Sequence, residues 1–448
     1  MRVLLVSNYF PPDSIGGVQL YTYRLAQELH RRGVMVHVVC TGEWATGEND
    51  LNAVRTEIVD NIPVTRIHLN WTKAEAPFRF LYDNPNVFRV MQSIIEEVRP
   101  SLLHITSCEP LSASVIFAAR QAGLPIVMTL AGYWFVCPRI TLQHADGHIC
   151  SAKVAGWECM RCLAWESKYQ QMARFLSERA QNSLLTRLGR IAWVTRRRGF
   201  IGMIGDMEER RRTLRDAFSH VDVVLAISEY VREAFVDSGL LDVSKLRVHE
   251  WGLPSVAPRS KTDHVEPNDL PVRIAYFGRI AMPKGVHILI EAFRQLNGAV
   301  SLVLHGNSGG GSSSYDDYLR SLAYDDERIC FWGPYNPAEA VDLMSRFDII
   351  VVPSVWPETY NLVAREALMA RRSVVASRIG ALPEAVCHEQ NGLLVSPNNV
   401  SELAIALQRL VDCPELREKL ESGQRRIKTL EQEMEELIAI YHGLRPVV

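Results

Sequence analysis

The chain has 448 residues, a formal net charge of -2 and a hydrophobic fraction of 47%. A single hydrophobic core rarely extends to this length, so we expect two domains. The balanced charge gives no overall attraction to nucleic acid or to acidic partners, which excludes a protein that binds nucleic acid through net charge alone.

The N-terminal run Met1–Ser7 is short and apolar and leads into a Pro-Pro turn, so it predicts a first buried strand and not a signal peptide. The longest uncharged stretch, residues 121–138, is interrupted by Gly123, Pro125 and Gly132. It therefore predicts a strand between loops and not a membrane span. We expect a cytoplasmic protein whose cysteines are reduced or metal-bound.

The first half of the chain alternates short apolar runs with helical patterns, which is typical of a parallel sheet covered on both faces. The strands are predicted at Arg2–Ser7, Val36–Thr41, Leu102–Thr106, Ile126–Leu130 and Val223–Ile227. The helices are predicted at Val18–Arg32, Val87–Val98, Leu111–Ala122 and Tyr230–Ser238.

A polar stretch with four prolines, residues 254–271, predicts a linker between residues 1–253 and a second α/β domain over residues 272–428. The strands of that second domain are predicted at Val272–Phe277, Val300–His305, Ile349–Val352 and Ser373–Ala376. Each is followed by a helical pattern, and charged helices follow over Glu415–Tyr441. An open parallel sheet binds ligands beyond the carboxyl ends of its strands, so two such edges facing each other predict an interdomain cleft.

Two cations close a tight loop between the strand Val272–Phe277 and a helix that begins near Val286. The loop opens with Gly278 and closes with Gly285, and glycine permits close backbone approach. Arg279 and Lys284 can clamp a diphosphate, the first as a fork and the second as a point charge.

Two carboxylates flank the start of a second helix, after the strand Ile349–Val352. Glu358 lies on the loop before the helix, and Glu366 lies about a turn and a half inside it. A helix N-terminus presents unpaired N–H groups and partial positive charge. A helix N-terminus flanked by two acids can bind a ligand that carries both phosphate and hydroxyl groups, and a nucleotide sugar is a ligand of this kind.

Together these motifs make the chain resemble the retaining glycosyltransferases of family 4, which have two facing Rossmann-like domains. The resemblance covers nearly the whole chain. It extends to a cysteine-rich insert, described below, that only a subset of the family carries. Its further parts are the runs Ser14–Val18, Val223–Val231, Gly380–Glu384 and Asn391–Val395. It implies the GT-B fold, an α/β fold with a helical and cysteine-rich insertion at residues 137–218, and a C-terminal helix at 429–448 that returns to the first domain.

The resemblance also implies roles for individual residues. Arg279 and Lys284 hold the diphosphate of a UDP- or GDP-linked sugar, Glu366 accepts hydrogen bonds from the ribose, and Glu358 contacts the donor sugar. The backbone N–H groups of Asn361, Leu362 and Val363 hold the distal phosphate. The glycines of the two loops, Gly278, Gly16 and Gly17, let the backbone approach the donor closely. The family often has glycine at the Asn361 position. The chain has no Asp-x-Asp pair, so no metal is expected to be required for catalysis.

One departure from the family concerns the loop after Ile126–Leu130. The family usually carries a histidine there that touches the donor sugar or the reacting centre, and this chain has Ala131 followed by Gly132. The change implies an altered donor, another residue acting in its place, or a weak or inactive enzyme. His104 is a candidate replacement, and a buried structural histidine is the alternative. Front-face retaining transfer without a protein nucleophile does not itself require the histidine.

Four cysteines follow this loop with the spacing C-x12-C-x8-C-x2-C: Cys137, Cys150, Cys159 and Cys162. The closing Cys-x-x-Cys is a common half of a zinc site, and four thiolates complete a tetrahedral set. The segment lacks the periodic apolar residues of a hydrophobic core, so a structural zinc would supply free energy for its folding. An iron–sulfur cluster and ordinary thiols are the alternatives.

The segment Arg174–Arg215 is basic and helical, with apolar residues between its arginines. It predicts either an amphipathic insertion with a solvated face or a patch that contacts a membrane surface or a lipid-diphosphate acceptor. Binding of single-stranded nucleic acid is a third alternative that no accompanying motif supports.

The sequence therefore predicts a cytoplasmic enzyme, at the inner membrane surface if the basic segment contacts lipid. It would transfer a sugar from a nucleoside diphosphate sugar to a saccharide or lipid-linked saccharide in cell-surface polysaccharide synthesis. A catalytically weak or inactive sugar-nucleotide-binding scaffold is the alternative.

Overall fold

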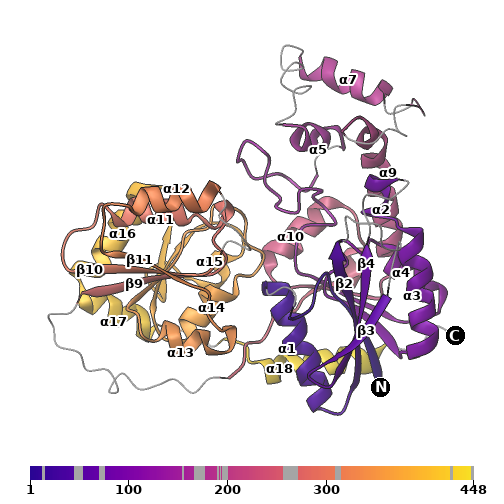
Figure 1. Ribbon diagram of the computed structural model, residues 1–448, viewed down its shortest axis with the longest axis horizontal. Helices are drawn as coiled ribbons and strands as arrows, with labels where there is room; N and C mark the ends of the chain where they lie inside the picture. Colours follow the sequence, from indigo (N-terminus) through magenta and orange to yellow (C-terminus); the bar gives the residue numbers. More distant parts are fainter. Residues whose placement is uncertain are drawn as a thin grey trace. The chain divides into compact units, whose positions relative to one another are not determined.

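The computed structural model describes residues 1–12, 16–44, 54–69, 76–153, 156–165, 177–188, 191, 193, 200–255, 271–307, 314–423 and 427–444. Contacts within the chain divide it into two compact units (Figure 1). The first comprises Met1–Glu250 with Glu433–Val448, and the second comprises Trp251–Gln432. Most of the predicted linker, residues 256–270, lies outside the described residues.

The first unit is built on an eight-stranded sheet with the order β3-β4-β2-β1-β5-β6-β7-β8. The strands are β1 (Arg2–Val6), β2 (Met35–Trp44), β3 (Val54–Val59), β4 (Ile62–Leu69), β5 (Leu102–Ile105), β6 (Ile126–Leu130), β7 (Val223–Ala226) and β8 (Leu246–Val248). The central strands are fully buried and mostly apolar, as expected for a sheet covered on both faces. The five predicted strands are confirmed, to within one residue at each end except that β2 extends further.

The prediction missed three strands of this sheet. β3 and β4 form an antiparallel hairpin at one edge, and β8 is a three-residue strand at the other. The sheet is therefore mixed at its β3 edge and not entirely parallel. β3 is largely exposed and carries three consecutive polar residues, Arg55 to Glu57, which is compatible with a solvated edge strand.

The helices of the first unit are α1 (Gly17–Arg31), α2 (Pro77–Phe80), α3 (Pro85–Val98), α4 (Ser114–Gln121), α5 (Gly156–Leu163), α7 (Glu178–Leu188), α9 (Phe200–Ser219), α10 (Glu229–Ser238) and most of α18 (Leu430–Gly443). Local sequence explains several of their ends. The Asn84 side chain accepts hydrogen bonds from the N–H groups of Asn86 and Val87, with Pro85 at the first helical position. Ser228 caps α10 in the same way, and Gly239 ends that helix in the left-handed conformation.

The second unit is built on a six-stranded parallel sheet with the order β11-β10-β9-β12-β13-β14. The strands are β9 (Val272–Phe277), β10 (Val300–His305), β11 (Ile329–Gly333), β12 (Ile349–Val352), β13 (Ser373–Ser377) and β14 (Gly392–Val395). The helices are α11 (Val286–Phe293), α12 (Ser314–Ala323), α13 (Ala340–Met344), α14 (Leu362–Met369), α15 (Leu382–Ala385), α16 (Val400–Asp412) and α17 (Pro414–Ser422). The four predicted strands are confirmed, while β11 and β14 were missed.

Two apolar clusters form the core of the second unit, one on each face of the sheet. Alternate residues of β9 point to opposite faces, so Ile274 and Tyr276 join one cluster while Ala275 and Phe277 join the other. Helices α11, α12 and α16 cover the first face, and α13 and α14 cover the second (Figure 1). The sheet is thereby buried on both faces, as a doubly wound α/β fold requires.

The strand order of the second sheet determines where a ligand can bind. β9 is the first strand of the unit, and it pairs with β10 on one side and with β12 on the other. The connections therefore run in opposite directions from β9, and the gap between β9 and β12 is the topological switch point. The loops that leave the carboxyl ends of these two strands flank that gap.

No helix in the described part of the chain is long and apolar enough to cross a membrane.

Candidate active site

The loops after β9 and β12 are in direct contact. Gly285 has a φ of 71°, and a Cβ atom there would lie 1.9 Å from the carbonyl oxygen of Pro353. The Val355 N–H donates to the Pro283 carbonyl oxygen at 2.9 Å, which joins the two loops a second time. Glycine at position 285 is thus required both by the backbone conformation and by the close approach of the β12 loop.

The contact between the loops brings Lys284 against Glu358. The Lys284 Nζ lies 2.8 Å from Glu358 Oε1. The same oxygen accepts hydrogen bonds from Ser354 Oγ at 2.6 Å and from Trp356 Nε1 at 3.0 Å. The Glu358 side chain is 5% exposed and that of Lys284 is 24% exposed, so the carboxylate is buried and its cation is half-buried.

These contacts keep Glu358 ionised. Burial alone raises the pKa of this carboxyl, because the charged form loses its hydration. The Lys284 charge and the hydrogen bonds from Lys284, Ser354 and Trp356 outweigh burial and hold the pKa of Glu358 below its usual value of 4.5. At neutral pH the site therefore contains a buried carboxylate that accepts hydrogen bonds and has no proton to donate.

A third loop, the one after β13, contacts the backbone of Glu358. Gly380, after β13, has a φ of 59°, and a Cβ atom there would lie 2.4 Å from both the backbone nitrogen and the backbone oxygen of Glu358. The Ala381 N–H donates to the Glu358 carbonyl oxygen at 2.8 Å. The roles of Gly380, Ser354 and Trp356 were not identified from the sequence, although all three lie inside or beside the motifs that it singled out.

The N-terminus of α14 follows this carboxylate. Asn361 precedes the helix with a φ of 63°, and its Oδ1 accepts a hydrogen bond from the Ala364 N–H at 2.9 Å. Glycine adopts a left-handed backbone freely, and asparagine is among the other residues that tolerate it. Because the side chain caps Ala364, the N–H groups of Leu362 and Val363 are the two first-turn donors left for a ligand.

Glu366 lies in the second turn of α14 and is 4% exposed. Its neighbour Arg365 is also buried and has a structural part. The guanidinium lies over the Tyr360 ring at 3.5 Å and donates to the Tyr360 carbonyl, while the Tyr360 hydroxyl donates to the Trp251 carbonyl. These contacts hold the turn that precedes α14 in place.

Arg279 differs from Lys284 in its surroundings. It is exposed, and its guanidinium makes no ion pair or hydrogen bond among the described residues. Its carbonyl oxygen accepts a hydrogen bond from the buried Tyr276 hydroxyl at 2.7 Å, which orients the loop backbone. The neighbouring Gly278 has a φ of 130°, and its carbonyl oxygen would lie 1.9 Å from a Cβ atom on Gly306. The side chain of Arg279 is thus carried on a fixed backbone and is available to an anion.

In the first unit, Gly16 is the N-cap of α1 and has an extended backbone, with a φ of -122°. A Cβ atom there would meet only the flexible Gln19 side chain. The two glycines therefore form the start of α1, and a contact of this loop with the donor stays a prediction. Residues 13–15 of the loop lie outside the described residues.

His104 is a structural residue. It is fully buried in β5, where its Nδ1 lies 2.6 Å from the Tyr441 hydroxyl of α18 and its Nε2 lies 2.8 Å from Thr129 Oγ1. Burial, with a smaller contribution from His249, lowers the pKa of His104 to about 3, so the ring is neutral. His104 thus does not replace the histidine that is missing at Ala131.

The four cysteines of the insertion gather near the end of β6, and all nine cysteines of the chain are free thiols. Burial and the neighbouring thiols raise the pKa of both Cys150 and Cys159 to about 12. Among the described residues, however, the group whose metal-ligating atoms all lie within 4.8 Å of one another is His144, Asp146 and His148, and it includes no cysteine. Zinc at Cys137, Cys150, Cys159 and Cys162 stays a prediction.

The basic segment Arg174–Arg215 is not uniformly a solvated face. Arg210 is buried in α9 and donates to the carbonyl oxygens of Trp134 and Phe135, which fixes the loop after β6. Arg211 donates to the Ser238 carbonyl at 3.0 Å. Several other members of the segment lie outside the described residues: Arg174, Arg190 and residues 196–198.

Two family models match the chain. A glycosyl transferase 4-like domain matches residues 16–252, and the group 1 glycosyl transferases match residues 271–413. The first region alone covers more than half of the chain.

Individual proteins agree with these matches. A D-inositol 3-phosphate glycosyltransferase of Corynebacterium jeikeium is 24% identical over 446 residues, with 93% of this chain and 90% of that protein covered. An uncharacterised protein from the cps region of Klebsiella pneumoniae is 23% identical, with 86% and 87% covered. The crystal structure of Anabaena HepE with UDP matches with a TM-score of 0.64 and 18% identity, over 99% of this chain and 100% of that one.

The fold of two Rossmann-like units is that of the GT-B enzymes, and the charged loops lie at the switch point where such a sheet binds its ligand. The chain belongs to the group 1, GT4-like glycosyltransferases, a retaining family, and it transfers a sugar from a nucleotide sugar.

Proposed function

We propose that the donor is a nucleoside diphosphate sugar, linked to UDP or GDP, and that its diphosphate binds between the β9 loop and the N-terminus of α14. The observation that carries this proposal is the Lys284–Glu358 ion pair, because it joins the two loops of the switch point and puts a cation beside a buried carboxylate. The UDP bound to Anabaena HepE supports a uridine nucleotide as the first donor to test.

Catalysis here rests on fixed charge. As the sugar–phosphate bond breaks, the leaving nucleoside diphosphate gains negative charge. Arg279, Lys284 and the N–H groups of Leu362 and Val363 stabilise that charge without reorganising. No metal ion takes part in this proposal.

Glu358 positions the donor sugar. Its Oε1 is occupied by three donors, and among the described residues its Oε2 has no partner. An ionised oxygen held in this way can accept hydrogen bonds from sugar hydroxyls but cannot act as a general acid. The acceptor hydroxyl attacks the anomeric carbon on the face that the diphosphate leaves, and its proton passes to the departing phosphate oxygen.

Glu366 accepts hydrogen bonds from the ribose hydroxyls in this proposal. Its burial on α14, one turn beyond Leu362 and Val363, fits a nucleoside whose phosphates lie at the helix start. Gly16 and Gly17 at the start of α1 are proposed to approach the donor through their backbone.

The acceptor is proposed to be a saccharide or a lipid-linked saccharide used in cell-surface polysaccharide synthesis. The relative from the Klebsiella cps region supports this class of pathway. The basic segment is proposed to contact the membrane surface at the cytoplasmic face, because Leu184, Ile191 and Trp193 are exposed apolar side chains among its arginines.

A donor-binding scaffold without turnover is the second candidate, and Ala131 is the residue that favours it. Turnover separates the two. The purified chain is incubated with radiolabelled UDP-glucose, GDP-mannose and related donors together with a lipid-linked saccharide extract. We expect labelled product with one donor.

Arg279→Ala should lower the rate by about 100-fold, the size found when one charge-stabilising donor is removed. Its control is Arg247→Ala, which removes an exposed arginine of β8 and should leave the rate unchanged. Equal rates for the wild type and Arg279→Ala would contradict the diphosphate assignment. Binding of a donor without transfer in any acceptor mixture would favour the scaffold.

A further inference from the structure

A short hairpin lies between Cys137 and Cys150 in the insertion. Gln143 and Ile149 form an antiparallel bridge, and the His144 N–H donates to the His148 carbonyl oxygen at 2.8 Å. Gly147, with a φ of 98°, completes the turn. Residues directly opposite in an antiparallel pair project to the same face, so the hairpin brings His144 and His148 together.

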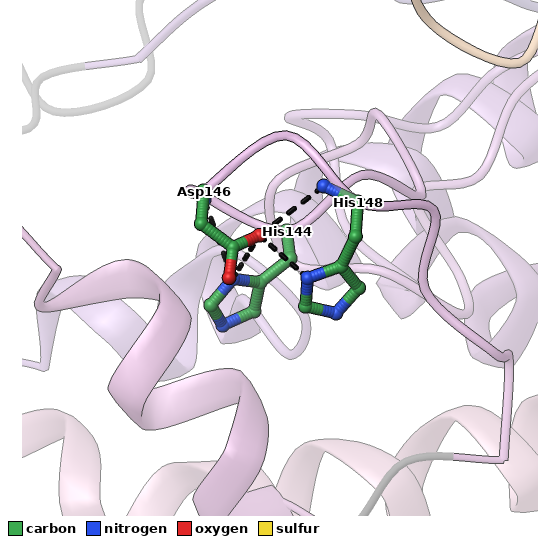
Figure 2. Close-up of side chains that lie close together, drawn as sticks. All are labelled: His144, Asp146 and His148. Carbon is green, nitrogen blue, oxygen red and sulfur yellow. Dashed lines mark hydrogen bonds and ion pairs between the residues drawn. The ribbon is translucent and has the colours of Figure 1, made fainter.

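The two imidazoles converge on one carboxylate oxygen (Figure 2). Their rings are stacked with centroids 4.6 Å apart and planes at 15°. The Nδ1 atoms of His144 and His148 lie 3.0 Å and 2.5 Å from Asp146 Oδ1. One ligand atom from each of these three residues lies within 4.8 Å of the other two.

The atoms that converge here can bind a cation. The Asp146 N–H donates to His144 Nδ1 at 3.3 Å, and in that tautomer the ring nitrogen presents a lone pair. The same nitrogen then faces the lone pairs of the Asp146 carboxylate. In the other neutral tautomer the Nδ1–H groups donate to the carboxylate, so the cluster is satisfied either by these protons or by a cation that accepts electron pairs from both imidazoles and the carboxylate.

We propose that His144, Asp146 and His148 bind one divalent transition-metal ion, with Zn²⁺ as the preferred ion. Two imidazole nitrogens and one carboxylate oxygen are borderline ligands of the kind that zinc takes. The side chains of Asp146 and His148 are 37% and 62% exposed, so the ion would keep positions for water and would exchange with solution. This site is separate from the one predicted for the four cysteines.

The hairpin packs against the end of α5, which suggests what the ion stabilises. The His144 ring lies edge-on to Trp165, which follows that helix, with centroids 5.3 Å apart. An ion held by His144 would therefore fix the turn on α5. Metal binding should therefore protect the hairpin from proteolysis.

The test is a Zn²⁺ titration of the full-length protein after treatment with a chelator and dialysis. We expect the double variant His144→Ala/His148→Ala to bind one equivalent fewer than the wild type, with the affinity of this site weakened at least 100-fold. Asp146→Asn keeps the histidine pair and should weaken it by a smaller factor. His30→Ala, at the exposed end of α1, is the matched control and should leave the titration unchanged.

A second variant, Cys159→Ser/Cys162→Ser, distinguishes the two sets of ligands. If the proposal holds, this variant still binds the ion of the histidine site, and Co²⁺ at that site gives visible d–d bands without a thiolate charge-transfer band. The proposal is overturned if the double histidine variant binds as many equivalents as the wild type with the same affinities. It is also overturned if the wild type binds no Zn²⁺.

Discussion

Both units have a sheet with a parallel centre, but the carboxyl ends of their first strands differ in charge. Beyond β9 and β12 in the second unit lie Arg279, Lys284 and Glu358, with a buried ion pair between the last two. Beyond β1 and β5 in the first unit the groups are mostly neutral, and burial raises the pKa of the one carboxyl in the β5 loop, Glu109. The hydroxyls of Thr22 and Thr106 form a hydrogen bond of 2.7 Å, and the Thr106 hydroxyl donates to the Val6 carbonyl.

The comparison shows that the doubly wound topology supplies a place for a ligand but not its charge. In the second unit the switch point carries fixed ions that suit a diphosphate. In the first unit the corresponding edge is a neutral layer that continues to His104 and Tyr441, where it ties α18 to the sheet. We propose that charge binds the donor in one unit, whereas neutral polar contacts hold the structure in the other.

The largest expected effect comes from breaking the ion pair. Lys284→Ala leaves Glu358 buried without its cation, so turnover should fall more than 100-fold and the free energy of unfolding should fall by about 2 kcal/mol. Adding Glu358→Gln to this variant removes the unpaired charge. The double variant should recover most of the stability but none of the turnover, as measured by urea unfolding and by the donor assay. Equal stability of Lys284→Ala and the wild type would contradict the pairing.

The next effect concerns the contact between the two loops. Gly285→Ala should weaken donor binding more than 10-fold, because its Cβ atom cannot fit beside the Pro353 carbonyl. The matched control is Gly239→Ala, which has a similar φ of 62° and no atom within 4 Å of the added Cβ. That control should lose only about 1 kcal/mol of stability from backbone strain and keep its donor affinity. Calorimetric titration of both variants with the donor nucleotide checks this, and equal losses of affinity would show that the loop contact is unimportant.

A smaller effect is expected in the neutral layer of the first unit, where His104 makes the stability depend on pH. The pKa of His104 is about 3 in the folded chain and 6.5 without burial, so below pH 6.5 the unfolded chain binds a proton that the folded chain does not. This contribution to stability is complete above pH 6.5 and is lost as the pH falls toward 3, by about 1.4 kcal/mol per pH unit. His104→Gln should remove this dependence of the free energy of unfolding on pH. Urea unfolding at pH 7.5 and pH 5.5 measures the free energy for both proteins. The same change between the two pH values in the wild type and the variant would contradict a neutral, buried His104.

The smallest effect is expected at the helix start. Asn361→Gly removes the cap on Ala364 but relieves the left-handed backbone, and glycine at an N-cap costs only a few tenths of a kcal/mol. Thermal unfolding and turnover should both stay close to those of the wild type. Asn361→Leu, which provides neither the cap nor a tolerated backbone, should lose about 2 kcal/mol. A large loss in the glycine variant would mean that the Asn361 side chain has a direct role in binding.

The buried strands at the centres of the two sheets were predictable from the sequence because they are mostly apolar, whereas β4, which is buried but carries several polar residues, was missed. The edge strands were not predicted, since β3 is largely exposed and β11 alternates half-buried residues with exposed ones, and both depend on a neighbouring strand to form. The strand β14 has only four residues and was noted only as part of a motif. Tertiary pairing, and not local preference, determines these three elements.

The charged residues of the site were also predictable, because each follows a strand directly. Their pairing was not. Lys284 and Glu358 are 74 residues apart and meet only because β9 and β12 are neighbours in the sheet. The sequence assigned them to different parts of the donor, whereas in the structure they form one unit. Gly380 was missed as a supporting residue for the same reason, since its contact with Glu358 depends on the order of β12 and β13.

The central claim is that the charged switch point of the second unit binds a nucleoside diphosphate. Its most direct test is calorimetric titration of the purified protein with UDP, GDP and ADP, repeated with Glu366→Ala. We predict selective binding of one nucleotide, which disappears in the variant while the thermal unfolding of the protein is retained. Binding of none of the three, or binding that Glu366→Ala leaves unchanged, would contradict the account.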